Sequence, residues 1–351
     1  MFLISDMLKI AVDMKASDLH ITAGIPPKCR VNGTLISITN GVLSSESTEM
    51  LIMNILTEVQ KEELENKGEV DCSYTVPELG RFRVNAYKQK GSYGIAIRVI
   101  NNKIPMPSEL GLSSFIVGVT EKKSGLVLVT GPTGSGKSTT LASLINEINT
   151  NSNRHIITLE DPIEYLHQHN KSIINQREIG SDTLSYTAGL RAALREDPDV
   201  ILVGEMRDFD TISTAITAAE TGHLVFSTLH TIGAVSTIDR IIDVFPPHQQ
   251  QQIRVQLSSV LRCVISQQLI PKKDKSGRVA AFEVMFNSVA IQNLIREGKG
   301  NQISTIMQTS KRDGMVLMDD YLMDLYNRQL IDMKYAMSYA QDPITLSKKL
   351  V

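Results

Sequence analysis

The sequence predicts an α/β domain built on a parallel sheet, preceded by a smaller α+β domain. From Leu126 onward, short apolar runs rich in β-branched residues alternate with helical runs, as they do in doubly wound parallel sheets. Residues 28–100 instead show short alternating strands between tight turns, which is typical of antiparallel pairing. The chain has 351 residues, more than one compact core usually holds, so we expect two domains.

The N-terminal domain is expected to span residues 1–100. A helix up to about residue 16 precedes a hairpin between residues 28 and 38, which turns at Asn32-Gly33, a pair that favours a type I′ turn. Residues 47–65 are interpreted as one charged helix. The remaining segments alternate polar and apolar side chains, as half-buried strands do: residues 69–76, 81–87 and 93–100.

A linker is expected over residues 101–113, because paired asparagines and two prolines disfavour regular structure there. The second domain then covers residues 114–351. After about Gln249 we expect mostly helix, with one more strand over residues 277–285. Before that point the strand-like runs are residues 126–130, 156–160, 199–205 and 224–229, and the helical runs between them include residues 183–195 and 211–220.

A glycine-rich stretch fits the pattern G-x-x-x-x-G-K-[ST] at every fixed position, between an apolar strand and a helix. Its glycines allow backbone N–H groups to turn inward around an anion, and the helix N-terminus adds partial positive charge. We expect it to bind nucleotide phosphates, with Lys137 at the β- and γ-phosphates and Ser138 on Mg²⁺. The residues of this cradle are Gly131, Pro132, Thr133, Gly134, Ser135, Gly136, Lys137, Ser138 and Thr139.

Carboxylates follow two of the expected strands. Glu160, Asp161 and Glu164 lie close together, an arrangement that suits water activation and Mg²⁺ binding beside a triphosphate. The alternative is a solvated acidic turn. Glu205 ends the strand at residues 199–205 and is a Walker B candidate that delivers a carboxylate toward Mg²⁺, with an ordinary strand-end charge as the alternative.

Histidines and arginines supply further candidates. His223 and His230 flank the strand at residues 224–229 at opposite ends, so a shared metal is not expected. Each is a candidate for contact with a γ-phosphate, and a structural or surface role is the alternative. Arginine is the expected partner for transition-state charge in phosphoryl transfer, but spacing alone does not choose among Arg81, Arg83, Arg98, Arg191, Arg195 and Arg240.

Composition excludes several classes of protein. The net charge is −2 and basic-aromatic clusters are absent from the sequence, so a nucleic-acid-binding protein is not favoured. The three cysteines, Cys29, Cys72 and Cys263, are far apart, which argues against a disulfide framework or a cysteine-rich zinc site. Apolar runs fall short of the ~18 residues that a spanning helix needs, so we expect a cytoplasmic protein that reaches a membrane only through a partner.

Four segments resemble, in the same order, the Walker A, Asp box, Walker B and His box of the secretion and type IV pilus ATPases: residues 131–139, 158–165, 194–208 and 221–231. Within that superfamily the chain resembles the PilT-type retraction ATPases, through residues 16–20, 80–85 and 290–297. Gln292 stands where that family usually has an arginine. Assembly ATPases of the superfamily are longer and typically carry a four-cysteine zinc motif, and this sequence shows neither feature.

The resemblance implies a PAS-like N-terminal domain, a RecA-like P-loop ATPase domain with a helical C-terminal part, and a hexameric ring. It implies ATP and Mg²⁺ as cofactors, with ATP between the two domains. Carried over by position, Glu164 resembles the catalytic carboxylate and Glu205 the Walker B acid. The arginines that resemble those of the family are Arg81, Arg98, Arg195 and Arg240.

The function implied is Mg²⁺-dependent ATP hydrolysis that powers type IV pilus retraction and twitching motility. The implied partners are further copies of the chain, the inner-membrane platform protein of the pilus and other pilus ATPases, which would bring the chain to the inner face of the membrane. A pilus assembly or type II secretion ATPase is the first alternative. A nucleotide-gated scaffold that does not cycle and a nucleic-acid translocase are the others.

Overall fold

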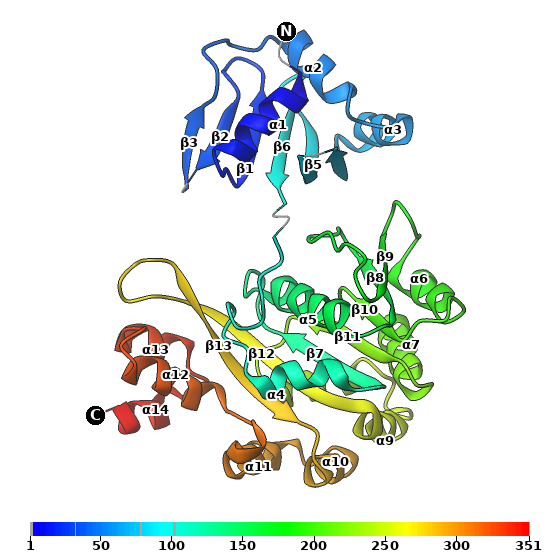
Figure 1. Ribbon diagram of the computed structural model, residues 1–351, viewed down its shortest axis with the longest axis vertical. Coiled ribbons are helices and arrows are strands. Elements are labelled where there is room, and N and C mark those ends of the chain that lie inside the picture. Colours follow the sequence, from blue (N-terminus) through cyan, green and yellow to red (C-terminus); the bar gives the residue numbers. More distant parts are fainter. Residues whose placement is uncertain (1–2, 32, 78, 101–102, 351) are drawn as a thin grey trace. The chain divides into compact units, whose positions relative to one another are not determined.

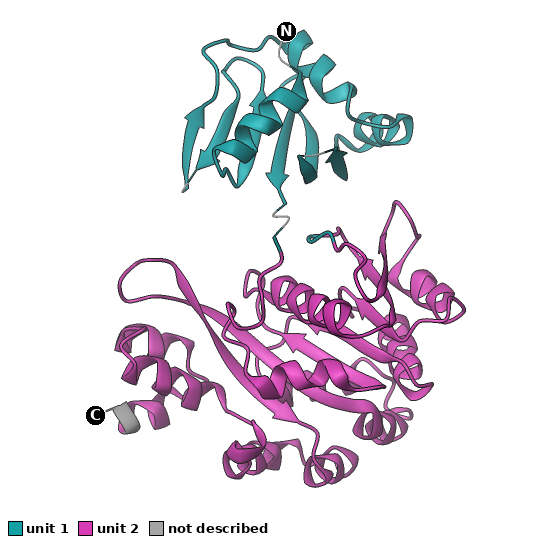
Figure 2. Ribbon diagram, viewed as in Figure 1, with its two compact units in different colours: residues 1–103, 164–166 teal, residues 104–163, 167–351 magenta. Residues whose placement is uncertain are grey.

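The chain divides into two compact units in the computed structural model, which describes residues 3–31, 33–77, 79–100 and 103–350. One unit comprises residues 1–103 with residues 164–166, and the other comprises residues 104–163 and 167–351 (Figure 2). Asn32 of the predicted turn and Asn101 and Asn102 of the predicted linker lie outside the described residues.

The first unit is built on a six-stranded antiparallel sheet with the strand order β3-β2-β1-β6-β5-β4 (Figure 1). Buried side chains from one face of the sheet, among them Leu19, Val84 and Ile97, pack with the apolar faces of its helices. Its elements are α1 (Ile4–Asp13), β1 (Asp18–Thr22), β2 (Lys28–Val31), β3 (Thr34–Ser37), α2 (Ser45–Met53), α3 (Glu58–Lys67), β4 (Glu69–Val76), β5 (Gly80–Gln89) and β6 (Ser92–Val99).

The prediction of one helix over residues 47–65 is wrong, because α2 ends at Met53 and α3 begins at Glu58. Thr57 caps the second helix: its Oγ1 accepts from Gln60 N at 3.3 Å, and Gln60 Oε1 accepts from Thr57 N at 2.9 Å. This reciprocal capping box satisfies N–H groups that a helix start otherwise leaves unpaired, so it favours a new helix at that point.

The second unit is a three-layer α/β domain whose seven-stranded sheet has the order β13-β12-β7-β11-β10-β8-β9. All neighbouring strands are parallel except β12 and β13. The strands and their helices are β7 (Gly125–Thr130), α5 (Lys137–Asn151), β8 (His155–Glu160), β9 (Ile173–Glu178), α6 (Tyr186–Ala193), β10 (Val200–Val203), α7 (Phe209–Glu220), β11 (Leu224–Leu229), α8 (Ala234–Asp243), α9 (Gln250–Val260), β12 (Leu261–Pro271) and β13 (Arg278–Phe286).

Both faces of this sheet are covered. Leu126 and Leu128 of β7 pack into a core with α6 to α11, whereas Val127 and Val129 pack into a second core that contains the apolar face of α5. Side chains alternate between the faces of a strand, so only a strand covered on both sides can be apolar at every position. The short helix α4 (Ser114–Val117) lies with α5 on that second face.

The C-terminal segment is helical, as predicted, and forms a small core of its own beside the β12–β13 hairpin (red in Figure 1). Met318 and Leu322 of α12 pack there with Ile270 of β12 and Ala281 of β13. The helices after β13 are α10 (Val289–Arg296), α11 (Ile303–Thr309), α12 (Met318–Asn327), α13 (Met333–Tyr339) and α14 (Pro343–Leu350).

The prediction of mostly helix after Gln249 is wrong for residues 261–271, which form the long strand β12 between β7 and β13. Ser266, Gln267 and Gln268 interrupt its apolar run, yet all three are buried. Their side chains are paired: Ser266 Oγ accepts from Gly233 N at 2.9 Å, Gln267 Oε1 accepts from Thr140 Oγ1 at 2.7 Å, and Gln268 Nε2 donates to Tyr339 O at 3.2 Å. These bonds offset the cost of burying polar groups inside a central strand.

Candidate active site

The glycine-rich loop connects the buried strand β7 to the helix α5 at the carboxyl edge of the parallel sheet. β11 and β12 flank β7 and fix the position where the loop starts. The loop and the first turn of α5 therefore lie where nucleotides bind in open α/β sheets.

Two glycines of the loop have no room for a side chain. A Cβ on Gly131, which has a φ of +139°, would lie 2.2 Å from the backbone oxygen of Gln267. A Cβ on Gly136, with a φ of +91°, would lie 2.9 Å from Gln267 Nε2. β12 thus packs directly against the loop, and both glycines are required by their backbone conformation and by this close approach.

The interior of the loop contains polar groups that suit an anion. Lys137 is only 8% exposed, and its Nζ donates to Gly131 O at 2.9 Å and to Pro132 O at 3.1 Å. Ser135 is 2% exposed, and within the described part of the chain its Oγ has no hydrogen-bond partner. Since buried hydroxyls are nearly always paired, this loop fits a ligand with phosphate oxygens. Ser138 is exposed on the first turn of α5.

Glu205 and His230 meet at the ends of the neighbouring strands β10 and β11. His230 Nε2 lies 3.1 Å from Glu205 Oε1, and His230 Nδ1 lies 3.4 Å from Thr133 Oγ1 of the loop. Arg207 Nη2 lies 2.7 Å from the other carboxylate oxygen, Glu205 Oε2. The structure therefore links the loop, the histidine and the Walker B candidate through direct contacts.

Charge near Glu205 controls its ionisation. Desolvation is the largest single influence and raises the pKa of Glu205, but the hydrogen bond and charge of Arg207, together with His230, outweigh it and leave the pKa below its usual range. Glu205 is thus held as a carboxylate, the form that binds a cation. Burial, with the charges of Asp161, Glu205 and Glu160 nearby, raises the pKa of Tyr186.

The acidic segment after β8 is held by its neighbours. Glu160 Oε1 accepts from Thr158 Oγ1 at 2.6 Å and from Gln176 Nε2 at 3.1 Å. The buried carboxylate of Glu178 accepts from Ile163 N at 3.0 Å and so fixes the turn that follows. Glu164 itself is exposed.

None of the described hydrogen bonds and ion pairs joins the other candidates of the second unit to the loop. His223 precedes β11, where its backbone oxygen accepts from Gly125 N at 3.0 Å, so it is at the opposite edge of the sheet from His230. Arg195 follows α6, ahead of the amino end of β10, and is exposed. Arg240 is exposed on α8. A catalytic role for these three residues stays a prediction.

The arginines of the first unit lie on one face of its sheet. Arg83 and Arg98 are direct neighbours across β5 and β6, and Arg98 Nε lies 3.1 Å from Asp18 Oδ1. Arg81 Nη2 donates to Ser73 Oγ at 2.6 Å. Strand register brings Arg83 and Arg98 together, and register is not visible in the spacing of residues along the chain.

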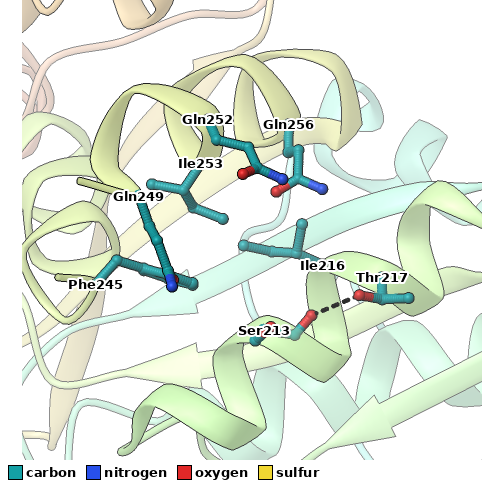
Figure 3. Close-up of a pocket in the computed structure, with 8 residues that line it drawn as sticks. All are labelled: Ser213, Ile216, Thr217, Phe245, Gln249, Gln252, Ile253 and Gln256. Atoms are coloured by element: carbon teal, nitrogen blue, oxygen red, sulfur yellow. Dashed lines mark hydrogen bonds between the residues drawn. The ribbon is translucent and has the colours of Figure 1, made fainter. Parts of the chain in front are cut away.

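A separate hollow of about 160 Å³ lies between α7 and α9 (Figure 3). Polar and apolar side chains both line it, and on the α7 side Thr217 Oγ1 donates to Ser213 O of the same helix at 2.9 Å. None of its lining residues belongs to the glycine-rich loop or to the strand ends that carry Glu205 and His230: Ser213, Ile216, Thr217, Phe245, Gln249, Gln252, Ile253 and Gln256. It is not part of the candidate active site.

A glycine-rich loop of P-loop sequence after a central parallel strand, with a carboxylate and a histidine at the ends of β10 and β11, is typical of a P-loop nucleotide-binding domain of RecA-like fold. The family model described as "Type II/IV secretion system protein" matches residues 1–334. The chain belongs to this family, and it is a nucleotide-hydrolysing enzyme with ATP as its nucleotide.

Individual relatives match both units. The chain is 47% identical over 340 residues to the type IV pilus retraction ATPase PilT of Pseudomonas aeruginosa, covering 97% of this chain and 98% of that protein. It is 44% identical over 340 residues to a twitching motility protein of Neisseria gonorrhoeae, covering 95% of this chain and 91% of that one. The crystal structure of the pilus retraction motor PilT with bound ADP matches with a TM-score of 0.94 at 47% identity, over 99% of this chain and 100% of that one.

Proposed function

We propose that this chain is the ATPase motor that powers retraction of a type IV pilus and thereby twitching motility. The observation that carries the proposal is the 47% identity to a pilus retraction ATPase over nearly the whole of both chains. The contacts among Thr133, His230 and Glu205 support it, because they connect the glycine-rich loop to a carboxylate suited to Mg²⁺.

Each residue of the loop has a proposed role. Backbone N–H groups of residues 131–139 and the Lys137 ammonium bind the phosphates of ATP, and Ser135 Oγ gains a phosphate oxygen as its partner. Ser138 and Glu205 hold Mg²⁺, since hydroxyl and carboxylate oxygens are the ligands that this ion prefers. The bound ion would neutralise charge on the phosphates.

The remaining residues act at the γ-phosphate. Glu164 orients or deprotonates the attacking water, and His230 connects the state of Glu205 to the loop. His223 lies at the opposite edge of the sheet from the loop, so it would relay the presence of a γ-phosphate only for a nucleotide bound by a neighbouring copy. Arginines neutralise charge that develops in the transition state, from the same chain or from neighbouring copies: Arg81, Arg98, Arg195 and Arg240.

The proposed assembly is a homo-hexamer on the cytoplasmic face of the cell membrane, bound to the inner-membrane platform protein of the pilus and to other pilus ATPases. Nucleic acid is not a partner in this proposal. Among the described residues, none of the helices combines the length and the apolar character needed to cross a bilayer. Contact with the membrane is therefore assigned to the pilus machine.

Steady-state phosphate release with Mg²⁺-ATP tests the chemistry. Lys137→Ala should reduce turnover to background, because the phosphates lose their cation, while Lys123→Ala, which removes an exposed lysine outside the loop, should not. Glu164→Gln should bind ATP and fail to hydrolyse it. Near-normal turnover of Glu164→Gln would exclude Glu164 as the catalytic carboxylate. If the wild-type chain itself showed no turnover, it would be a nucleotide-gated scaffold instead.

A strain that lacks this chain tests the direction of the motor. Loss of retraction should leave the cells piliated but unable to twitch. Cells without pili would identify an assembly ATPase and contradict the proposal.

A further inference from the structure

Glu283 is a buried carboxylate that the hydrolysis chemistry does not use. It lies on β13, is 3% exposed, and binds three segments that are far apart in the sequence. Its Oε1 accepts from Ala234 N at 2.7 Å, and its Oε2 accepts from Met318 N at 3.2 Å and from Gln341 Nε2 at 3.0 Å. These donors belong to the start of α8, the start of α12 and the connection between α13 and α14.

The first of these contacts reaches the active site through a short turn. Ser266 and Glu283 are direct partners across β12 and β13, and they accept from the consecutive N–H groups of Gly233 and Ala234. The chain between β11 and this pair is the turn that begins with His230. Since His230 contacts both Glu205 and Thr133, the position of its ring depends on where the turn is held.

The second set of contacts reaches the C-terminal helices. A Cβ on Gly233 would lie 3.0 Å from Gln341 Nε2 and 3.4 Å from Glu283 Oε1, so the amide of Gln341 packs directly against the turn. The connection that carries Gln341 is fixed further by Asp319, whose carboxylate accepts from Gln341 N at 2.7 Å and from Asp342 N at 2.9 Å. Glu283 is thus the shared acceptor between the turn and the C-terminal helices.

We propose that Glu283 is a positioning residue for ATP hydrolysis, which holds the His230 turn and couples it to α12, α13 and α14. This inference deepens the proposed function and rests on ATP hydrolysis at the glycine-rich loop. A change at the γ-phosphate that moves His230 pulls on Gly233 and Ala234, and the carboxylate transmits this displacement to Met318 and Gln341.

Glu283→Gln tests the proposal with little change in volume. The amide oxygen can still accept from Ala234 N, but the new NH₂ faces two donors, Met318 N and Gln341 Nε2. In the full-length chain we expect kcat to fall about tenfold and the KM for ATP to stay within about twofold, because the loop is unchanged and His230 is misplaced. The double variant with Gln341→Glu restores a donor–acceptor pair at residue 341 but leaves Met318 N facing the NH₂, so it should recover part of the lost kcat.

A matched control separates positioning from general loss of stability. Met307→Ala removes a buried side chain on α11, outside all of these contacts, and should lower the melting temperature without lowering kcat. A comparable fall in kcat for Met307→Ala, or an unchanged kcat for Glu283→Gln, overturns the inference. If the wild-type chain itself releases no phosphate, the proposed function fails instead.

Hydrogen exchange measures the coupling directly. With Mg²⁺-ATP, the wild-type chain should gain protection in residues 318–342 as well as in residues 131–139. In Glu283→Gln the protection of the loop should remain and that of the C-terminal segment should be lost. Equal protection of both segments in the two proteins contradicts the coupling.

Discussion

At the residue scale, Gly136 shows how closely β12 packs against the glycine-rich loop. Gly136→Ala adds a Cβ at a φ of +91° and 2.9 Å from Gln267 Nε2, so either the loop or the Gln267 amide, which accepts from Thr140 Oγ1, must shift. We expect the affinity for ADP, measured by calorimetry, to fall more than about tenfold, because the close contact with Gln267 adds to the ~1–2 kcal/mol that a left-handed conformation costs.

Gly134→Ala is the matched comparison, since a Cβ at Gly134 meets nothing within 4 Å and carries only the cost of a φ of +77°. Gly134→Ala should therefore reduce the affinity for ADP by less than Gly136→Ala does. In a chain that also carries Gln267→Ala, the amide is gone, so Gly136→Ala should reduce the affinity for ADP by less than it does alone. Equal losses for Gly134→Ala and Gly136→Ala would show that β12 does not restrict the loop.

At the scale of elements, α7 depends on the N-terminal cap that follows β10. Asp208 Oδ1 accepts from Thr211 N at 2.9 Å, and Oδ2 accepts from Thr211 Oγ1 at 2.9 Å. Asp208→Ala should lower the free energy of unfolding by ~1 kcal/mol, measured in urea, because an N–H at the helix start loses its acceptor. Asp210→Ala, an exposed acid in the same turn, should cost clearly less; a similar loss for both would contradict the capping role.

Sequence patterns predicted those elements whose local signals agree with the tertiary structure. The strands β7, β8 and β11 and the apolar face of α5 follow directly from their apolar runs. β12 was missed because Gln267 and Gln268 are buried through hydrogen bonds to residues distant in sequence. Such partners cannot be read from a local pattern.

The same limit applies to the candidate site. The rule that sites lie at the carboxyl ends of parallel strands predicted where Glu205 would lie. Its contact with His230, its ion pair with Arg207 and the pairing of Arg83 with Arg98 depend on side-chain geometry and strand register. Spacing along the chain fixes neither side-chain geometry nor strand register.

At the scale of the whole molecule, the first unit has a core of its own and a complete antiparallel sheet. We predict that residues 1–100 fold when produced alone, because about 100 residues can bury enough apolar surface for a stable domain. A single cooperative thermal transition followed by circular dichroism would support this. A Phe82→Ala variant, which empties a fully buried position, should unfold at a lower temperature; an uncooperative melt of the unmodified fragment would contradict it.

The β12–β13 hairpin also has a mechanical consequence. β12 pairs with β7 up to Ser266, and its register with β13 continues to Pro271, so residues 266–271 form an arm ~17 Å long at 3.4 Å per residue, which packs beside the C-terminal helices. A tilt of about 5° at Ser266 would displace the Pro271 end by roughly 1.5 Å over that length. We expect the hairpin to act as a lever, so probes attached at its tip should report small movements near the glycine-rich loop in magnified form.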